Sequence, residues 1–399
     1  MARDPCRSRD RGRRDPPPLP VSPVRRAAAV SADTLIVGGG PAGAAAAITL
    51  ANARAPHLLI ERSRVVGDAL CGGFLSWRSL DTLAALGLDP DALNRDRVTR
   101  VRLFAGTRMV EAPLPRPAIG VSRHRLDTLL MHRAVAAGAR VERGLAVRAI
   151  DDGVRLDDGA TLAPRALFLA SGKHDVRGRA RPAAARGEDP SLGLRVRLAP
   201  HPSLDRLVGD AIELHAFDRG YAGIVRQEDR SVNVCLALRR SRLHAAGSPA
   251  ALLAELGDEC PALGERLAFG FPAADAVANV PYGWRATAGE DGLFRLGDQS
   301  GVIPSLAGEG MGIALASGVS AAHAHLAGIG AADWQRAFAR RLRRPIGIAS
   351  LIRALAERPA LSRIALPALG LVPAIPQMVA KATRIPPDPV RYGPAALEI

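Results

Sequence analysis

The first strong pattern in the chain is a short apolar run that ends in glycines. The run Thr34–Val37 is aliphatic and β-branched, Gly38–Gly43 follows it, and an alanine-rich segment continues to about Arg54. A second apolar run, 57–60, ends in Glu61. Short continuous apolar runs are typical of buried strands, and the alanine-rich segment between them indicates a helix. The pattern therefore predicts a strand–turn–helix–strand unit of a parallel α/β sheet.

Alternating apolar and polar positions predict antiparallel strands in the middle of the chain. Segments 98–104 and 108–112 are expected to form a hairpin, which the prolines of 113–117 should end. The remaining alternating segments are 192–198, 211–216, 222–226 and 232–238. These segments predict an antiparallel sheet that is separate from the parallel one.

Shorter segments and helices fill the rest of the pattern. A small meander is expected from 147–150, 154–156 and 166–169, with Asp-Gly turns. Helices are expected at 77–88, 126–137, 249–256, 261–267 and 311–327, and Gly257 should end the third of them. From residue 331 the chain is expected to be helical and rich in arginine, and then apolar with prolines from Ile364 to Val379. Residues 1–30 are rich in arginine and proline and are expected to be disordered.

Composition excludes several classes of protein. The chain has 399 residues, 48% of them hydrophobic, and a net charge of +15. Of its 54 basic residues 52 are arginine, and no basic run is interleaved with aromatic residues, so nucleic acid is not an expected partner. The four cysteines are widely spaced and indicate neither a zinc site nor a disulfide framework. A reducing cytoplasm is the simplest location, and the apolar stretch Ile364–Val379 leaves peripheral membrane contact open.

The glycine turn has the spacing of a dinucleotide site. Gly38, Gly40 and Gly43 occupy the three glycines of G-x-G-x-x-G, and Pro41 and Ala42 lie between them. In this motif the pyrophosphate lies on the N-terminus of the helix, where free N–H groups favour negative charge. Glu61 lies about 20 positions on, at the end of the second strand, where an acidic residue binds the adenosine ribose.

A second glycine-rich stretch adds a site for a flavin. Asp298 follows Gly297 at the end of an expected strand and can accept hydrogen bonds from sugar-alcohol hydroxyls. The loop that follows leads to Gly308, Gly310, Met311 and Gly312 at the start of the expected helix 311–327. Free N–H groups there would stabilise the negative charge that a flavin gains at its N1 and C2 carbonyl edge on reduction.

Together these motifs resemble the geranylgeranyl reductase family of FAD-dependent oxidoreductases, which is related to the group A flavoprotein monooxygenases. The resemblance rests on the glycine turn with Glu61, the stretch Cys71-Gly72-Gly73, Arg123 with Leu126-Asp127, and the stretch from Gly297 to Met311. It implies that FAD is bound by Gly38, Gly40, Pro41, Ala42, Gly43, Glu61, Arg62, Arg123, Val147, Asp298, Gly308, Gly310, Met311 and Gly312. In this resemblance Arg123 lies near the pyrophosphate, Val147 near the adenine, and Cys71 near the flavin ring, as a proton donor or a wall residue.

The expected fold is α/β, with a Rossmann-like FAD-binding domain, an inserted antiparallel substrate domain and C-terminal helices. The FAD-binding domain is expected to comprise 31–96, 118–180 and 285–330. The substrate domain is expected to comprise 97–117 and 181–284, and 331–399 is expected to be helical. FAD at the boundary between the two domains would meet the substrate there.

Three functions fit this fold. The first is a reductase that transfers hydride from reduced flavin to C=C bonds of an apolar, isoprenoid-like substrate. The second is an NAD(P)H-dependent monooxygenase that hydroxylates an aromatic or polyketide substrate, and the third is a non-catalytic FAD-binding protein. The monooxygenases usually carry an Asp-Gly pair before their Val-Arg, and the stretch from Ser171 to Arg177 is shorter and lacks that aspartate. Tyr221 lacks the tryptophan that often accompanies it in the reductases. No second G-x-G-x-x-G is present, so electrons are expected from NAD(P)H at a transient site or from an electron-donor protein.

Overall fold

The computed structural model describes residues 33–271, 273–371 and 374–388, and the tail expected to be disordered, 1–30, lies outside them. Its first layer is a five-stranded, wholly parallel sheet with the order β16-β10-β1-β2-β6. The strands are β1 (Thr34–Val37), β2 (Leu58–Glu61), β6 (Arg140–Arg143), β10 (Ala166–Leu169) and β16 (Leu293–Arg295). The sheet confirms the predicted strand–turn–helix–strand unit.

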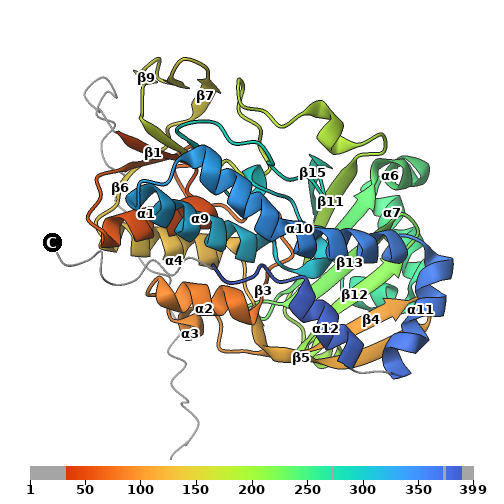
Figure 1. Ribbon diagram of the computed structural model, residues 1–399. Helices are drawn as coiled ribbons and strands as arrows, with labels where there is room; N and C mark the ends of the chain where they lie inside the picture. Colours follow the sequence, from red (N-terminus) through yellow and green to blue (C-terminus); the bar gives the residue numbers. More distant parts are fainter. Residues whose placement is uncertain (1–32, 272, 372–373, 389–399) are drawn as a thin grey trace, which may run out of the picture.

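Three helices that position the glycine turn lie together beside this sheet (Figure 1). They are α1 (Pro41–Asn52), α4 (Arg123–Ala136) and α9 (Gly310–Leu326). Almost every residue of α1 is buried, which explains why its apolar positions are mostly alanine. A Cβ at Gly318 of α9 would lie 2.2 Å from the Ala42 carbonyl oxygen. Small residues on both helices therefore let their backbones come into contact.

The second layer is an eight-stranded sheet with the order β15-β11-β14-β13-β12-β4-β5-β3. Only β4 and β12 pair in parallel within it. The strands are β3 (Phe74–Leu75), β4 (Val98–Ala105), β5 (Arg108–Gly120), β11 (Ser191–Leu198), β12 (Ala211–Phe217), β13 (Gly220–Arg226), β14 (Val232–Arg239) and β15 (Ala274–Val280). The predicted antiparallel strands are thus all present, in a sheet that also takes in β4 and β5 from earlier in the chain.

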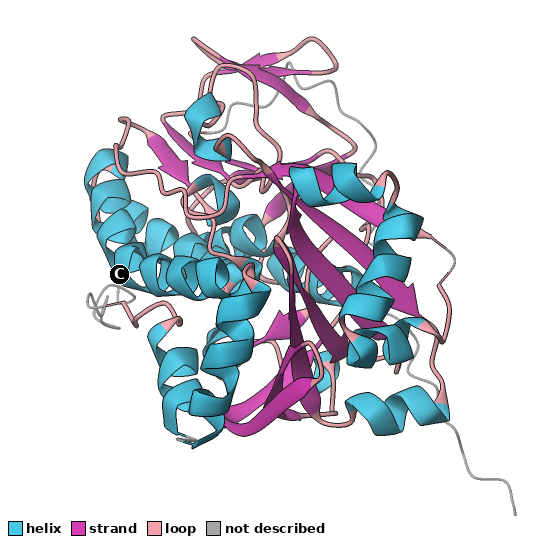
Figure 2. Cartoon of the chain, turned by 90° about the vertical axis from the view of Figure 1, so that its right-hand side faces the viewer, coloured by secondary structure: helices cyan, strands magenta, loops and turns pink. Residues whose placement is uncertain are grey.

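The two faces of this sheet have different partners because side chains alternate along each strand. One face is apolar and packs under short helices (Figure 2). Those helices are α5 (Pro202–Val208), α6 (Arg240–Ala246), α7 (Pro249–Glu259) and α8 (Pro261–Leu267). The opposite face carries the alternate residues, among them Arg195, Tyr221, Asn233 and Cys235, and faces the loop that follows β2. This second face therefore forms one wall of the candidate site.

Three details differ from the sequence-based expectations. Prolines 113–117 do not end the hairpin, because β5 continues to Gly120. The pairing of β4 with β5 is irregular between the pairs Arg100–Pro113 and Val98–Ala118, so Pro115 and Pro117 interrupt no regular ladder there. Strand β3 pairs with β5 only at residues 119 and 120. Segment 166–169 is not part of the meander. It is β10, and the third meander strand is β9 (Thr161–Leu162), beside β7 (Val147–Ile150) and β8 (Val154–Leu156).

Gly257 does not end its helix, because α7 runs on to Glu259. A Cβ at Gly264 of α8 would lie 2.7 Å from the Gly257 carbonyl oxygen. Glycines at these positions therefore let the two helices come into contact. A local sequence pattern for a helix end does not reveal this tertiary requirement.

The C-terminal part is helical, as predicted. It consists of α10 (Ala331–Ala356), α11 (Pro359–Leu371) and α12 (Ala374–Ala382). Helix α10 runs from the parallel sheet toward the large sheet, where α11 and α12 pack near β4 and β5 (Figure 1). Two helices near the site complete the fold, α2 (Trp77–Ala85) and α3 (Pro90–Leu93). In the part of the chain that is described, no helix is both long enough and apolar enough to cross a bilayer.

Candidate cofactor-binding site

The glycine turn between β1 and α1 has the geometry that a pyrophosphate requires. A Cβ at Gly43 would lie 1.9 Å from the Gly38 carbonyl oxygen, so only glycine allows α1 to start this close to β1. Gly40 is the N-cap of α1 and Pro41 is its first residue, and no side chain caps the helix. The N–H groups of the first turn therefore have no intrahelical or side-chain partner and can bind an anion.

Glu61 is held against this turn from the end of β2. Its Oε2 accepts a 2.7 Å hydrogen bond from the Gly39 N–H, and its Oε1 accepts a 2.8 Å hydrogen bond from the Ser63 N–H. Both carboxylate oxygens are thus oriented by backbone donors, and each keeps a further lone pair. A carboxylate fixed in this way beside the glycine turn fits the hydroxyls of an adenosine ribose.

Arg123 brings a positive charge to the same turn from the start of α4. Its guanidinium forms a two-pronged ion pair with Asp127 one turn along, at 2.9 and 2.7 Å. A Cβ at Gly40 would lie 3.4 Å from Nη2 of Arg123, so the guanidinium borders the turn. Burial raises the pKa of the Asp127 carboxyl, although the ion pair opposes that shift. Asp127 therefore orients Arg123, and the cation lies beside the turn at which a pyrophosphate is expected.

Asp298 lies in a 3₁₀ turn (Gly297–Gln299) that follows β16. Gly297 packs against Ala42 of α1, and the charges of Asp298 and Arg123 influence each other. The Asp298 carbonyl accepts a 3.1 Å hydrogen bond from buried Arg181. The turn is thus fixed by its backbone, and the fold brings the Asp298 side chain near Arg123.

The start of α9 completes the predicted set. The stretch Gly308–Gly312 begins at a left-handed Gly308, which lies against Phe74. Glu309 is the N-cap of α9, and its side chain caps none of the first-turn N–H groups. Met311 is buried and Gly310 is exposed. The N-terminus of α9 therefore presents free backbone donors near α1, as expected for a flavin edge.

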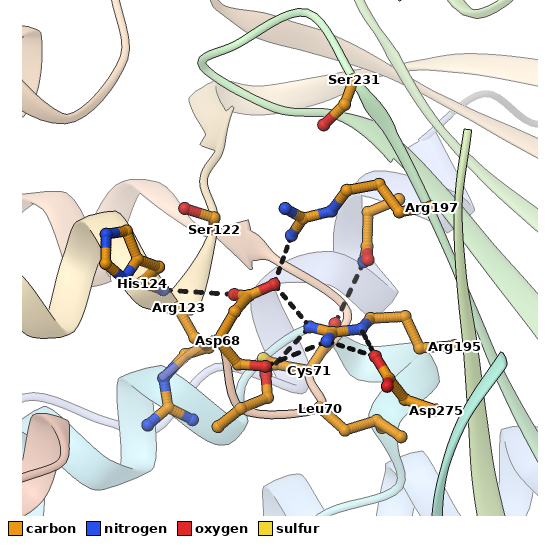
Figure 3. A network of polar contacts seen from close by, with 12 residues as sticks. Asp68, Leu70, Cys71, Ser122, Arg123, His124, Arg195, Arg197, Ser231 and Asp275 are labelled. Carbon is orange, nitrogen blue, oxygen red and sulfur yellow. Dashed lines mark hydrogen bonds and ion pairs between the residues drawn. The ribbon is translucent and has the colours of Figure 1, made fainter. Parts of the chain in front are cut away.

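The loop that carries Cys71 is fixed by side chains of the large sheet (Figure 3). Arg195 of β11 donates to the Asp68 and Ala69 carbonyls and pairs with the Asp68 and Asp275 carboxylates. Asn233 of β14 donates to the Cys71 and Gly72 carbonyls at 3.0 and 2.9 Å. Cys71 itself is half-buried and lies near both Arg123 and Cys235.

The remaining predicted residues lie at the edge of this arrangement. Arg62 is exposed beside Glu61. Val147 begins β7, and the preceding Gly144 donates to the Glu61 carbonyl, so this segment borders the end of β2 that carries Glu61. Sequence reasoning missed Arg181, Arg195 and Asn233, which fix the site loops. The site-loop carbonyls to which they donate lie more than 100 positions away in the chain, so no local pattern could have indicated these contacts.

The residues present fit both the adenosine diphosphate end and the ring end of FAD. Free donors of α1 and the Arg123 guanidinium suit its pyrophosphate, the fixed Glu61 carboxylate suits its ribose, and the start of α9 suits its ring.

Comparison with known proteins agrees with this geometry. Residues 31–179 match the family model of an FAD binding domain. A menaquinone reductase of Mycolicibacterium smegmatis is 32% identical over 162 residues, which cover 37% of this chain and 39% of that protein. Digeranylgeranylglycerophospholipid reductase 1 of Methanopyrus kandleri is 28% identical over 77% of this chain and 84% of its own length.

A solved structure shows the same fold over most of the molecule. The flavoprotein/dehydrogenase from Cytophaga hutchinsonii superposes with a TM-score of 0.74 and 17% identity, over 89% of this chain and 92% of that one. The matched domain supports FAD as the cofactor, and the solved structure shows that the fold is shared. The similarity to digeranylgeranylglycerophospholipid reductase 1 over most of the chain agrees with the resemblance expected from the motifs.

Proposed function

We propose that this enzyme reduces C=C bonds of an apolar, isoprenoid-like substrate at the boundary between the parallel and the eight-stranded sheets. When bound, FAD supplies the hydride that such a reduction needs. The proposal places its adenosine end at Glu61 and its ring between the start of α9 and Cys71. In this assignment the FAD-binding unit comprises 31–96, 118–180 and 285–330, and the substrate unit comprises 97–117 and 181–284.

The observation that carries the proposal is a set of uncharged hydroxyl and thiol groups that lie on and beside the sheet face toward the Cys71 loop. Tyr221 of β13 is buried, and its hydroxyl lies 2.7 Å from Ser305 Oγ, to which Tyr282 donates at 3.1 Å. Burial raises the pKa of Tyr221 to about 12 and that of the Cys235 thiol to about 12. These groups stay uncharged at neutral pH, which suits an apolar chain rather than an ionic ligand.

The relatives support the same substrate class. Menaquinone and geranylgeranyl compounds, which the relatives' names specify, all carry unsaturated isoprenoid chains. Addition of hydrogen across a C=C bond needs a proton as well as a hydride. Cys71 lies at the proposed ring and is our candidate proton donor, with a wall position as the alternative role. The electron donor in this proposal is NAD(P)H or an electron-donor protein.

We also propose that the C-terminal helices contact a membrane surface peripherally. The exposed face of α10 is basic in its first half, at Arg336, Arg340, Arg343 and Arg344, and apolar in its second half, at Leu351 and Leu355. Leu361, Ile364 and Met378 continue the apolar part onto α11 and α12, and Ile364 is 74% exposed. Basic and apolar residues on one exposed stripe favour an anionic lipid surface, where an isoprenoid substrate would reside.

The first test asks whether FAD binds where we place it. The purified protein should show the absorption bands of oxidised flavin. Gly40→Val and Asp298→Ala should each lose the bound FAD while the far-ultraviolet circular dichroism stays unchanged. Gly67→Ala is the matched control, because a Cβ there meets nothing within 4 Å. Full FAD occupancy in either site variant would remove that residue from the proposed site.

The second test asks which reaction is catalysed. Under anaerobic conditions with NADPH, NADH or dithionite, geranylgeranyl diphosphate or menaquinone should gain hydrogen, as mass spectrometry of the product would show. Cys71→Ser should lower turnover with little effect on FAD content if the thiol is the proton donor. Unchanged turnover would leave Cys71 as a wall residue. Substrate-dependent oxygen consumption without hydrogenated product would instead identify a monooxygenase.

A further inference from the structure

The segment that follows α12 packs against the turn at the start of α9. Thr383, Arg384 and Ile385 follow α12 and are exposed by only 2, 6 and 5%. The Ile385 carbonyl accepts a 2.6 Å hydrogen bond from Arg78 of α2, which ties the segment to the FAD-binding side of the molecule. Burial of a charged arginine costs free energy of desolvation unless an opposite charge and hydrogen-bond acceptors compensate for it.

Arg384 has such partners on every nitrogen. Its Nη1 donates to Glu309 Oε2 at 2.5 Å and to the Gly308 carbonyl at 3.0 Å. Its Nη2 donates to the Ala307 carbonyl at 2.5 Å, and its Nε donates to the Ala380 carbonyl at 3.0 Å. The guanidinium also lies 5.3 Å from the ring centre of Trp77. Arg384 thus holds the turn that leads into α9 and the N-cap residue of α9.

Glu309 is the other half of the pair, and it is fully buried. Besides Arg384, its carboxylate accepts hydrogen bonds from Ser76 Oγ at 3.1 Å and from the Ile385 N–H at 3.2 Å. A Cβ at Gly312 would lie 2.6 Å from Glu309 Oε1, so the carboxylate lies directly on the first turn of the helix. A negative charge is therefore built into the place where the proposed function needs a positive potential.

We propose that Arg384 is the positioning residue that cancels the Glu309 charge and so keeps the α9 N-terminus favourable to the flavin edge that becomes negative on reduction. The proposal rests on the proposed placement of FAD at α9. An uncompensated carboxylate beside the helix terminus would oppose that negative charge and lower the reduction potential of bound FAD. The segment after α12 would thus tune the cofactor site although it lies at the far end of the chain.

The test separates the effect of the Arg384 charge from the effect of the shape of its side chain. Arg384→Met removes the charge, Arg384→Lys keeps it, and Glu309→Gln with Arg384→Met removes both charges. Arg341→Met is the control, because Arg341 holds the same segment at the Pro386 carbonyl and at Asp388 but does not touch Glu309. The measurements are the midpoint potential of bound FAD against reference dyes and the dissociation constant of FAD by fluorescence.

Arg384→Met should bind FAD more weakly, on the order of tenfold, and should have a more negative midpoint potential. The double variant, Arg384→Lys and Arg341→Met should have potentials close to that of the unmodified protein. A wild-type potential in Arg384→Met would overturn the proposal, as would an equal shift in the double variant. Should Arg384→Met fail to fold, a shifted potential in the double variant or in Arg384→Lys would overturn it in the same way.

A separate pair of variants tests the placement of FAD on which this inference rests. Gly310 is exposed at the start of α9, and a Cβ there meets nothing within 4 Å. Gly310→Asp should make the potential more negative, and Gly310→Ala should leave it unchanged. If the unmodified protein binds no FAD, or if Gly310→Asp has no effect, the proposed site is wrong. If Gly310→Asp shifts the potential and Arg384→Met does not, only the role of Arg384 is wrong.

Discussion

A buried histidine illustrates how single residues in this fold control its stability. His215 of β12 is fully buried, and its ring stacks on that of Phe104 with the ring centres 4.2 Å apart. Its Nε2 lies 3.2 Å from Glu213 Oε2. Glu213 also pairs with Arg266 at 3.0 Å and with Arg102 at 3.3 Å. Burial lowers the pKa of His215 below its usual 6.5, although Glu213 opposes the shift, so the ring is held neutral in the fold.

The sign of the pH dependence follows from linkage. Below about pH 6.5 the unfolded chain binds a proton at His215 that the folded chain does not, so stability falls as pH falls. The loss is at most about 1.4 kcal/mol per pH unit for one proton. His215→Gln can still donate to Glu213 but does not titrate. Urea denaturation at pH 7, 6 and 5 should show a smaller loss of unfolding free energy in this variant, and equal losses would contradict the assignment.

At the scale of elements, the loop before β3 depends on two strands of the large sheet. Asn233 holds the Cys71 and Gly72 carbonyls with one amide group. Asn233→Leu should leave both carbonyls unpaired, which costs about 1–3 kcal/mol per buried group. Amide hydrogen exchange in 68–73 should become faster. Cys235→Ala, two positions on and on the same face, is the control. Unchanged exchange in Asn233→Leu would mean that Arg195, Arg197 and Lys173 hold the loop without Asn233.

Elements that depend on local patterns could be predicted from the sequence, and those that depend on distant partners could not. The parallel unit at Thr34–Glu61 follows from apolar runs and glycines, and β11 to β14 follow from alternation. Strand β10 has the same short apolar pattern as a meander strand, and only its pairing with β1 distinguishes it. Likewise the motif residues around Gly40 and Gly308 could be predicted, whereas Arg384 could not, because its partner Glu309 lies 75 positions earlier.

At the scale of the whole molecule, α10 and its exposed stripe run from the parallel sheet toward the large sheet. Helix α10 packs on β16 at one end, and near its other end Arg353 donates a hydrogen bond to Ser191 of β11, so it connects the proposed FAD-binding and substrate units (Figure 1). The stripe on its exposed face changes from arginine to leucine along the same direction. A lipid surface that contacts the apolar end would therefore lie near the large sheet, which forms the proposed substrate wall.

Vesicle binding tests this arrangement. The protein should sediment with vesicles of phosphatidylcholine and phosphatidylglycerol, and binding should weaken at high salt, because each basic residue near an anionic surface contributes about 1 kcal/mol. Leu351→Glu with Ile364→Glu should reduce the bound fraction several-fold, because charged residues replace the side chains that would enter the lipid interface. Val135→Glu on α4 is the control, since Val135 is apolar and 39% exposed but lies outside the stripe. Equal binding by both variants, or none by the unmodified protein, would show that the stripe does not contact lipid.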